Sequence, residues 1–148
     1  MRRRGFLLAG ALAATQLARA QVAPALHDVR ALVREVTGGA QPQSGGIEVE
    51  LPQIAENGHS VPLRIRVAHP MTTASHVRAV HVFAERNPRP RIATFHFSPG
   101  SGRAEVATRV RLAGTQKVTV LAELSDRTFR VAEVSVLVTT GACLDDSL

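Results

Sequence analysis

The chain from Ile47 to Thr140 alternates apolar and polar residues with a period of two, which is the pattern of half-buried β-strands. The clearest case is VPLRIRVA (61–68), in which the apolar residues share one face and the two arginines the other. Similar segments occupy 47–51, 76–85, 91–97, 104–112, 117–124 and 129–140, with turn-forming residues between them. Seven short strands without a Cys–Trp–Cys pattern predict an all-β, immunoglobulin-like antiparallel sandwich that is not of the antibody type.

A helical pattern precedes the strands. Apolar residues recur at positions 26, 29, 32, 33 and 36, which places them on one side of a helix. Pro24 stands near the start of this pattern, and Gly38 and Gly39 follow its end. We therefore expect a short amphipathic helix from about Pro24 to Thr37, followed by a linker from Ala40 to Gly46.

The first twenty residues have the layout of an export signal. A basic start is followed by a short apolar stretch and by Ala-Arg-Ala, which predicts cleavage after Ala20, with an uncleaved anchor as the alternative. Four residues form a twin-arginine motif: Arg3, Arg4, Phe6 and Leu7. That route carries folded proteins, so a periplasmic location is expected. The chain then divides into the signal (1–20), the helix and linker (21–46), the sandwich (47–140) and a C-terminal tail (141–148).

The formal net charge of +6 comes mostly from this signal. Outside it, 14 basic residues stand against 12 acidic ones, and aromatic residues make up only 3% of the sequence. A nucleic-acid surface needs clustered basic residues and aromatic residues for stacking, so that class of function is disfavoured. In NPRPR (87–91) the two prolines cannot donate to a strand ladder. We expect a solvated turn there, with an anion contact through its arginines as the alternative.

Six histidines raise the question of a metal site, but their spacing argues against one. A copper site of the cupredoxin type needs a histidine soon after its cysteine and an axial methionine. No histidine follows Cys143, Met71 lies in a predicted turn, and no histidine pair has zinc-motif spacing. His81 and His96 fall inside predicted strands and are expected to be hydrogen-bonded structural residues. No metal or cofactor is therefore expected.

An enzyme is also disfavoured. The sequence has neither a G-x-S-x-G elbow nor a glycine-rich phosphate loop. A Ser–His–Asp triad is defined by its geometry in space and is left to the structure. No catalytic residue is assigned.

Cys143 is the only cysteine of the chain. In an oxidising compartment it has no partner within its own chain. It could be incidental, it could link two chains, or it could be a handle on which another molecule is carried. An incidental exposed thiol would react with any disulfide it meets, which argues against the first interpretation. A thiol beyond the last predicted strand can enter the narrow active sites of other enzymes, which favours the third.

Three segments resemble the SoxY family of sulfur-oxidation carrier proteins. They are PQIAENGHSVPLRIRV (52–67), the stretch 69–126 with its core HVFAERNPRPRIATFHFSP, and the tail Gly141-Ala142-Cys143. The resemblance covers nearly the whole chain after the signal. It implies an immunoglobulin-like sandwich that carries sulfur and catalyses nothing alone. It also implies that Cys143 is the covalent attachment point, acting as a thiolate, and that Gly141 and Ala142 form a flexible arm.

The resemblance also implies a set of partners. A second small sandwich protein, SoxZ, forms a heterodimer with the carrier and is exported with it. The c-type cytochrome complex SoxXA attaches thiosulfate to the cysteine, the hydrolase SoxB releases sulfate, and the sulfane dehydrogenase SoxCD oxidises the remaining sulfur. We expect the partner surface on an exposed apolar sheet face.

The tail departs from the usual family ending, which is Gly-Gly-Cys-Gly-Gly. Ala142 replaces the second glycine, and residues 144–148 (LDDSL) replace the last two. Leu144 adds bulk beside the sulfur, and the two aspartates place negative charge near a thiol that meets anionic thiosulfate. Two hypotheses therefore stand. The chain is a sulfur carrier whose partners or cargo suit this tail, or it is a docking subunit that binds partners without carrying sulfur.

Overall fold

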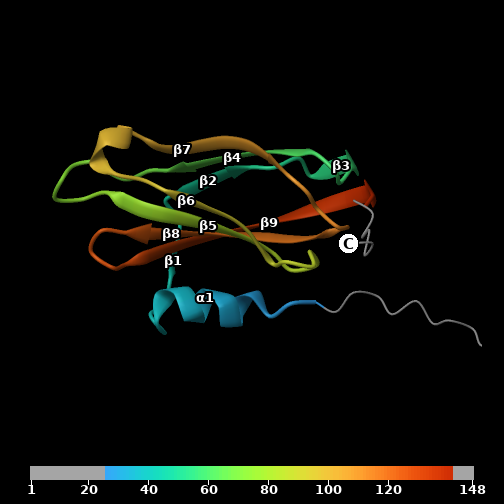
Figure 1. Ribbon diagram of the computed structural model, residues 1–148, viewed down its shortest axis with the longest axis horizontal. Coiled ribbons are helices and arrows are strands. Elements are labelled where there is room, and N and C mark those ends of the chain that lie inside the picture. The colour runs from blue at the N-terminus through green and yellow to red at the C-terminus, as the bar shows by residue number, and fades with distance from the viewer. Residues whose placement is uncertain (1–25, 142–148) are drawn as a thin grey trace, which may run out of the picture.

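The computed structural model describes residues 26–141, which form a two-layer β-sandwich with one helix packed on the outside (Figure 1). The elements are α1 (Val29–Thr37), β1 (Gln43–Ser44), β2 (Ile47–Glu50), β3 (Ile54–Asn57), β4 (Val61–Val67), β5 (Val77–Ala84), β6 (Arg91–His96), the short 3₁₀ helix η1 (Pro99–Ser101), β7 (Ala104–Val110), β8 (Gln116–Leu124) and β9 (Phe129–Thr140). The larger sheet has the order β1-β9-β8-β5-β6, with β3 also paired to β9, and the smaller sheet has the order β2-β4-β7. The predicted immunoglobulin-like sandwich is confirmed.

Two short strands were not predicted from the sequence. β1 lies in the expected linker and β3 in the segment between the first two expected strands, and both pair with β9 in parallel. Neither carries a readable alternation, because β1 has two polar residues and β3 has only four residues. The long strand β9 fixes their positions, because its backbone N–H and C=O groups are available there for hydrogen bonding with β1 and β3.

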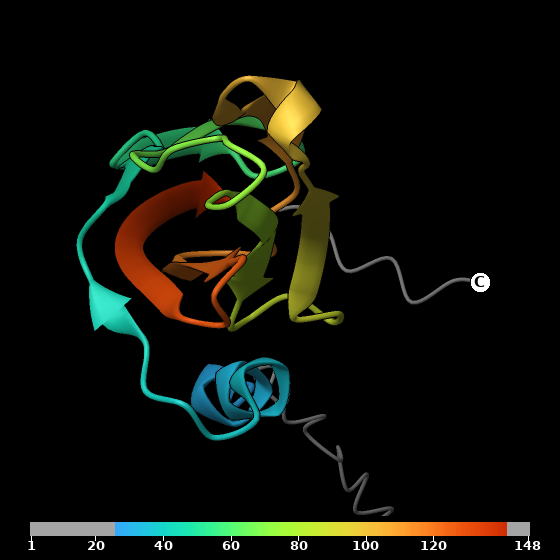
Figure 2. The ribbon, with the colours of Figure 1, turned by 90° about the vertical axis from the view of Figure 1, so that its left-hand side faces the viewer.

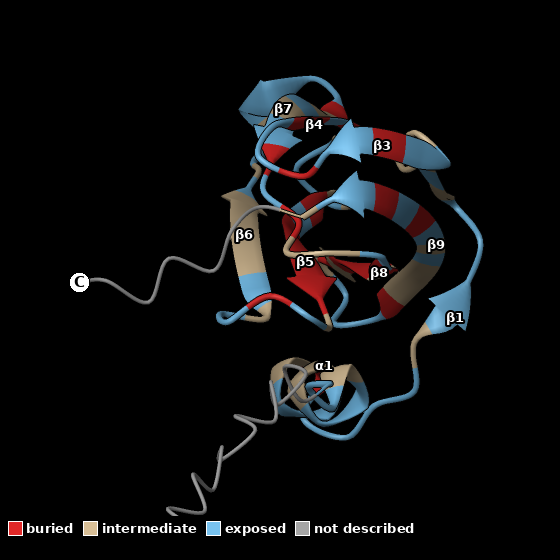
Figure 3. Ribbon diagram, turned by 90° about the vertical axis from the view of Figure 1, so that its right-hand side faces the viewer, coloured by how far each residue is buried: buried red, intermediate tan, exposed pale blue. Residues whose placement is uncertain are grey.

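The main core lies between the two sheets. In β4 the burial pattern alternates strictly, with the apolar residues inward and the arginines outward, as the sequence predicted. The inward residues of β4 pack with valines of the larger sheet; these core residues are Val61, Leu63, Ile65, Val67, Val80, Val82, Val118, Val120 and Val136. In β5, by contrast, residues 79–84 are all buried, because this strand is covered on both faces (Figure 3).

The helix is shorter than the sequence predicted. It begins at Val29 rather than near Pro24, because the side chain of Asp28 accepts a hydrogen bond from the backbone N–H of Ala31 and caps the first turn. It ends as expected, at Thr37 before Gly38, whose φ of 62° lies in the left-handed region that favours glycine. Within residues 26–141, no helix has the length and apolar character needed to cross a membrane.

The helix covers part of the outer face of the larger sheet (Figure 2). Its apolar side chains Val29, Leu32, Val33 and Val36 pack on a second core made by Phe83, Leu121 and Phe129. The second core explains why β5 and β8 are apolar on both faces. The end of β9 lies outside this cluster and carries an exposed leucine, Leu137.

Candidate functional site

The predicted attachment site lies beyond the last strand. β9 ends at Thr140, and Gly141 is the last residue that the structure describes. The other predicted site residues lie outside the described range: Ala142 and Cys143 of the tail, Arg3, Arg4, Phe6 and Leu7 of the export motif, and the cleavage position after Ala20. The described part of the site is therefore the point at which the chain leaves the sandwich (Figure 3).

Two neighbouring segments hold the end of β9 in place. The backbone N–H of Gly58 donates to the carbonyl of Thr140 at 2.8 Å, and the hydroxyl of Thr139 donates to the carbonyl of Glu56 at 2.9 Å. Gly58 in turn accepts a hydrogen bond from the backbone of Leu112 at 2.8 Å. The strand end is thus fixed to β3, to the β3–β4 turn and, through that turn, to the loop between β7 and β8.

Gly141 packs closely on this β7–β8 loop. A Cβ atom at this position would lie 2.5 Å from the carbonyl oxygen of Ala113 and 3.3 Å from its carbonyl carbon. Backbone atoms cannot rotate away as a flexible side chain can, so only glycine fits here without a shift of the chain. The family resemblance implies that Gly141 belongs to a flexible arm, and that role stays a prediction. In the structure this half-buried residue borders the loop, and the small size of glycine is what fits there.

We expect Gly141→Ala to lower the free energy of unfolding by about 1–3 kcal/mol, the usual cost of forcing an added group into a filled space. Urea unfolding of the two proteins measures the difference. Gly114→Ala is the matched control, because a Cβ at Gly114 meets nothing within 4 Å and its φ is not in the left-handed region. Equal losses in the two variants would show that the contact with Ala113 is not the cause.

A buried network of polar side chains holds the β7–β8 loop in place. Asn87, on the β5–β6 loop, donates to the carbonyl of Arg111 at 2.7 Å and accepts from the backbone N–H of Ala113 at 2.9 Å. The side chain of Gln116 donates to Asn87 Oδ1 at 3.0 Å and accepts from the backbone N–H of Arg86 at 2.9 Å. Asn87 and Gln116 are only 8% and 4% exposed. Sequence reasoning missed both residues, because neither belongs to a motif and the bonds that join the two loops span more than twenty residues.

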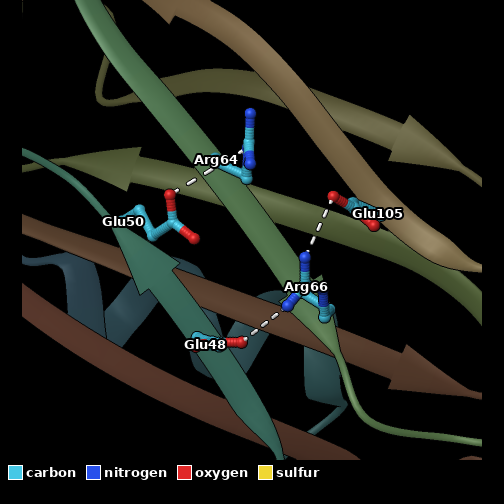
Figure 4. A network of polar contacts seen from close by, with 5 residues as sticks. All are labelled: Glu48, Glu50, Arg64, Arg66 and Glu105. Atoms are coloured by element: carbon cyan, nitrogen blue, oxygen red, sulfur yellow. Dashed lines mark hydrogen bonds and ion pairs between the residues drawn. The ribbon is translucent and has the colours of Figure 1, made fainter.

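The two arginines of β4 are already paired with glutamates (Figure 4). On the outer face of the smaller sheet Arg66 lies 3.3 Å from both Glu48 and Glu105, and Arg64 lies 4.0 Å from Glu50. The hydrogen bond and charge of Glu105, followed by the charge of Glu48, raise the pKa of Arg66 above its ordinary value. Because these groups are exposed, the pairs add little stability. Their effect is to leave this face without an excess of positive charge.

His81 is less fully hydrogen-bonded than the sequence suggested. Its Nδ1 lies 3.2 Å from the hydroxyl of Thr94, but its buried Nε2 has no hydrogen-bond partner among residues 26–141 and stands 4.0 Å from a carboxylate oxygen of Glu123. Burial lowers the pKa of His81 below 6.5, Arg91 and His96 lower it further, and Glu123 opposes them. The expectation of a satisfied strand histidine is therefore wrong for one of its two ring nitrogens.

This depressed pKa predicts a loss of stability in acid. The unfolded chain binds a proton at His81 at a higher pH than the folded chain does, so stability falls as the pH drops below 6.5 toward the folded pKa, by at most about 1.4 kcal/mol per pH unit. Melting temperatures from about pH 7.5 to about pH 5 measure this. His81→Gln should flatten the profile, whereas His96→Gln, at an exposed position, should not. Parallel profiles for the wild type and His81→Gln would refute the assignment.

The remaining histidines form no metal or catalytic site in the part of the chain that the structure describes. No group of three or more His, Cys, Asp or Glu residues there could hold a metal ion. His69 Nε2 lies 2.9 Å from the hydroxyl of Ser75, at the end of the sandwich opposite the chain exit. No carboxylate within residues 26–141 lies within ion-pair distance of His69, so no Ser–His–Asp triad is assembled at this pair.

Fold and site together define an immunoglobulin-like β-sandwich whose only cysteine stands three residues after the end of the last strand. The sequence profile of the family described as "Sulfur oxidation protein SoxY" matches residues 33–143, so the matched range ends on that cysteine. This range is three quarters of the chain. The chain belongs to the SoxY family of sulfur carrier proteins.

Solved structures agree with this assignment. The sulfur carrier protein SoxY from Chlorobium limicola f thiosulfatophilum is 26% identical, with a TM-score of 0.62 over 75% of this chain and 96% of that one. A superoxide reductase (neelaredoxin) from Ignicoccus hospitalis is 17% identical, with a TM-score of 0.57 over 64% and 80% of the two chains. The superoxide reductase from Nanoarchaeum equitans is 15% identical, with a TM-score of 0.55 over 65% and 100%. These two enzymes share the fold alone. None of the curated proteins compared with the chain matches it.

Proposed function

We propose that this chain is a periplasmic carrier subunit that holds thiosulfate-derived sulfur covalently on Cys143 and presents it to partner enzymes. The observation that carries the proposal is that the family match ends on the only cysteine of the chain, two residues beyond Gly141. The strand end before it is fixed to β3 and, through the β3–β4 turn, to the β7–β8 loop. The chain therefore leaves for the cysteine from a fixed point, which suits a carried group that visits several enzymes.

The chemistry of loading follows from the thiolate, which is the nucleophilic form of cysteine. A sulfur–sulfur bond forms between Cys143 Sγ and the terminal sulfur of thiosulfate, giving –S–S–SO₃⁻, and two electrons leave to the c-type cytochrome complex SoxXA. Hydrolysis by SoxB then adds water across the bond to the sulfonate group, releases sulfate and two protons, and leaves a persulfide for SoxCD. The carrier contributes the attachment atom, and its partners contribute the catalytic groups.

The proposal includes a heterodimer with SoxZ, and an exposed apolar pair beside the chain exit supports it. Ile54 and Leu137 are direct neighbours in the β3–β9 ladder and are 61% and 48% exposed. Large apolar side chains side by side on a sheet are more typical of an interface than of a solvated face. Their place beside the end of β9 would set the partner next to the cysteine-bearing tail.

We expect Leu137→Asp to weaken SoxZ binding about tenfold or more, the effect of placing a charge in the apolar centre of an interface. The folded carrier should keep its melting temperature, because Leu137 already faces solvent. Ser135→Asp is the matched control, on the same strand and the same exposed side. Titration of labelled carrier with SoxZ measures the affinities, and an unchanged affinity for Leu137→Asp would remove this pair from the interface.

Intact mass spectrometry tests the carrier function directly. The protein is isolated without reductant from the periplasm of cells fed with thiosulfate and of cells grown without it. A chain that begins at Gln21 and bears a thiosulfonate or persulfide on Cys143 only in the fed cells is the expected result. The mass of the unloaded chain reports at the same time whether the signal has been removed after Ala20.

The second candidate function is a docking subunit that carries no sulfur, or a carrier of another sulfur cargo. The tail sequence LDDSL supports this second candidate, because larger and acidic residues replace the two glycines that usually follow the cysteine. A free thiol in fed cells, or one found only in a disulfide between two chains, supports the docking subunit. A different adduct mass identifies the other cargo.

A further inference from the structure

Three arginines at the exit end of the sandwich have no ion-pair partner within residues 26–141. They are Arg86 and Arg89 on the β5–β6 loop and Arg111 on the β7–β8 loop, and all three are exposed. Most other arginines on the strands are occupied: Arg64, Arg66, Arg78 and Arg91 pair with glutamates, and Arg109 donates to Ser60. Positive charge that is not neutralised by a neighbouring described residue therefore collects on these two loops.

The fold holds the two loops together. Asn87, the residue between Arg86 and Arg89 that points inward, bonds to the backbone of both Arg111 and Ala113. Gln116 bonds to the backbone of Arg86. The nearest acidic residue on either loop, Glu85, uses a carboxylate oxygen to accept from the backbone N–H of Lys117 at 3.1 Å. The arginines are thus carried on one rigid support rather than on independent turns.

The chain exit borders the same support. Gly141 packs on Ala113, two residues along from Arg111. Cys143 is two residues beyond Gly141, so its backbone stays within about 7 Å of Gly141 along any path. An arginine side chain has a similar reach. A group bound to Cys143 can therefore reach guanidinium groups on these two loops.

We propose that Arg86, Arg89 and Arg111 form a binding site for the sulfonate end of the cargo that Cys143 carries. The inference rests on the proposed carrier function. It adds that the arginines bind the cargo while the carrier is not bound to a partner enzyme. A sulfonate has three acceptor oxygens, and the planar guanidinium fork donates two parallel hydrogen bonds to such a group. The same charges draw anionic thiosulfate compounds toward the thiol before the bond forms.

The loading of the full mature chain with tetrathionate tests the site without any partner enzyme. The Cys143 thiolate attacks one of the inner sulfurs of tetrathionate, the –S–S–SO₃⁻ adduct forms, and thiosulfate leaves with the electron pair of the broken bond. The variant R86Q/R89Q/R111Q is compared with R103Q/R127Q/R130Q, which removes three arginines at the opposite end of the sandwich. The rate of adduct formation is followed by intact mass at low salt and at about 1 M salt, where the screening length is only about 3 Å.

We expect the exit-end variant to load about three- to tenfold more slowly than the wild type at low salt and equally fast at high salt. The far-end variant should follow the wild type at both. In the wild type, loading should also shift the NMR signals of the Nε–H groups of Arg86, Arg89 and Arg111, and tetrathionate-treated C143S should show no such shift. Equal slowing in the two triple variants, or unshifted arginine signals in the loaded protein, would overturn the site.

The tail carboxylates are the other source of anionic groups within reach. The variant D145N/D146N distinguishes binding of these carboxylates by the arginines from binding of the cargo. If the aspartates occupy the arginines, the arginine signals shift on this substitution in the unloaded protein and loading leaves them unchanged, which overturns the proposal. Absence of an adduct in thiosulfate-fed cells would refute the carrier function but would leave the loading rates and NMR shifts standing, so the two failures are distinguishable.

Discussion

Cys143→Ser should abolish sulfur loading completely. The chain has no second cysteine, and a serine hydroxyl neither ionises at neutral pH nor forms the sulfur–sulfur bond that the cargo requires. Intact mass spectrometry should show no adduct in thiosulfate-fed cells, and thiosulfate oxidation should stop in a strain whose only copy of the gene carries the substitution. Unchanged oxidation in that strain would refute the carrier function.

A displaced thiol provides the control for this experiment. In C143S/S147C the number of thiols is unchanged, but the sulfur stands four residues further along the tail. We expect this protein to react with tetrathionate in solution yet to fail to support thiosulfate oxidation, because the active sites of the partner enzymes receive the thiol at a fixed distance from the sandwich. Full oxidation by the displaced variant would show that the tail needs a thiol but no defined position.

Asn87→Ala should lower the free energy of unfolding by about 2–4 kcal/mol. The substitution leaves the carbonyl of Arg111, the N–H of Ala113 and the amide of Gln116 without the partner that they share, and each buried group left unpaired costs about 1–3 kcal/mol. The expected loss is smaller than the sum of three such costs, because the backbone groups of the loop can form hydrogen bonds with water instead. Urea unfolding measures the loss.

Asn57→Ala is the matched control, since the chain has only these two asparagines. Asn57 accepts a hydrogen bond from the backbone of His59 at 2.8 Å in an exposed turn, so its loss should cost less than about 1 kcal/mol. A second measurement connects the network to function: Asn87→Ala should reduce the effect of the exit-end arginines on tetrathionate loading. Similar stability losses for both asparagines would mean that the network does not support the loop.

The sequence was most informative where local pattern and burial coincide. The alternation in β4 predicted which of its residues face the core, whereas the half-buried strand expected at 76–85 did not reveal that residues 79–84 of β5 are all buried. The helix end at Gly38 followed from glycine punctuation, whereas its start at Val29 depends on one side-chain bond from Asp28 that competes with the earlier Pro24 signal. β1 and β3 escaped prediction because only their pairing with the distant β9 makes them strands.

For the site, the sequence predicted an attachment atom but not its surroundings. A single cysteine after the last strand is visible in the chain itself, and the family resemblance gave it a role. The packing of Gly141 on Ala113 and the junction of the two arginine-bearing loops through Asn87 depend on strand order, which local sequence does not encode. NPRPR could be interpreted as a turn with two arginines, but its place beside the chain exit required the fold.

The pairing of β9 with β1 and β3 bears on how the protein is made. The larger sheet contains both the first strand of the chain, β1, and the last, β9. It can therefore be completed only after β9 has left the ribosome, because β1 and β3 both pair with β9. Until then one edge of β8 lacks its partner strand, and an unpaired strand edge in a new chain is prone to aggregation. The larger sheet is therefore completed only once β9 has been made and has paired with β8, β1 and β3.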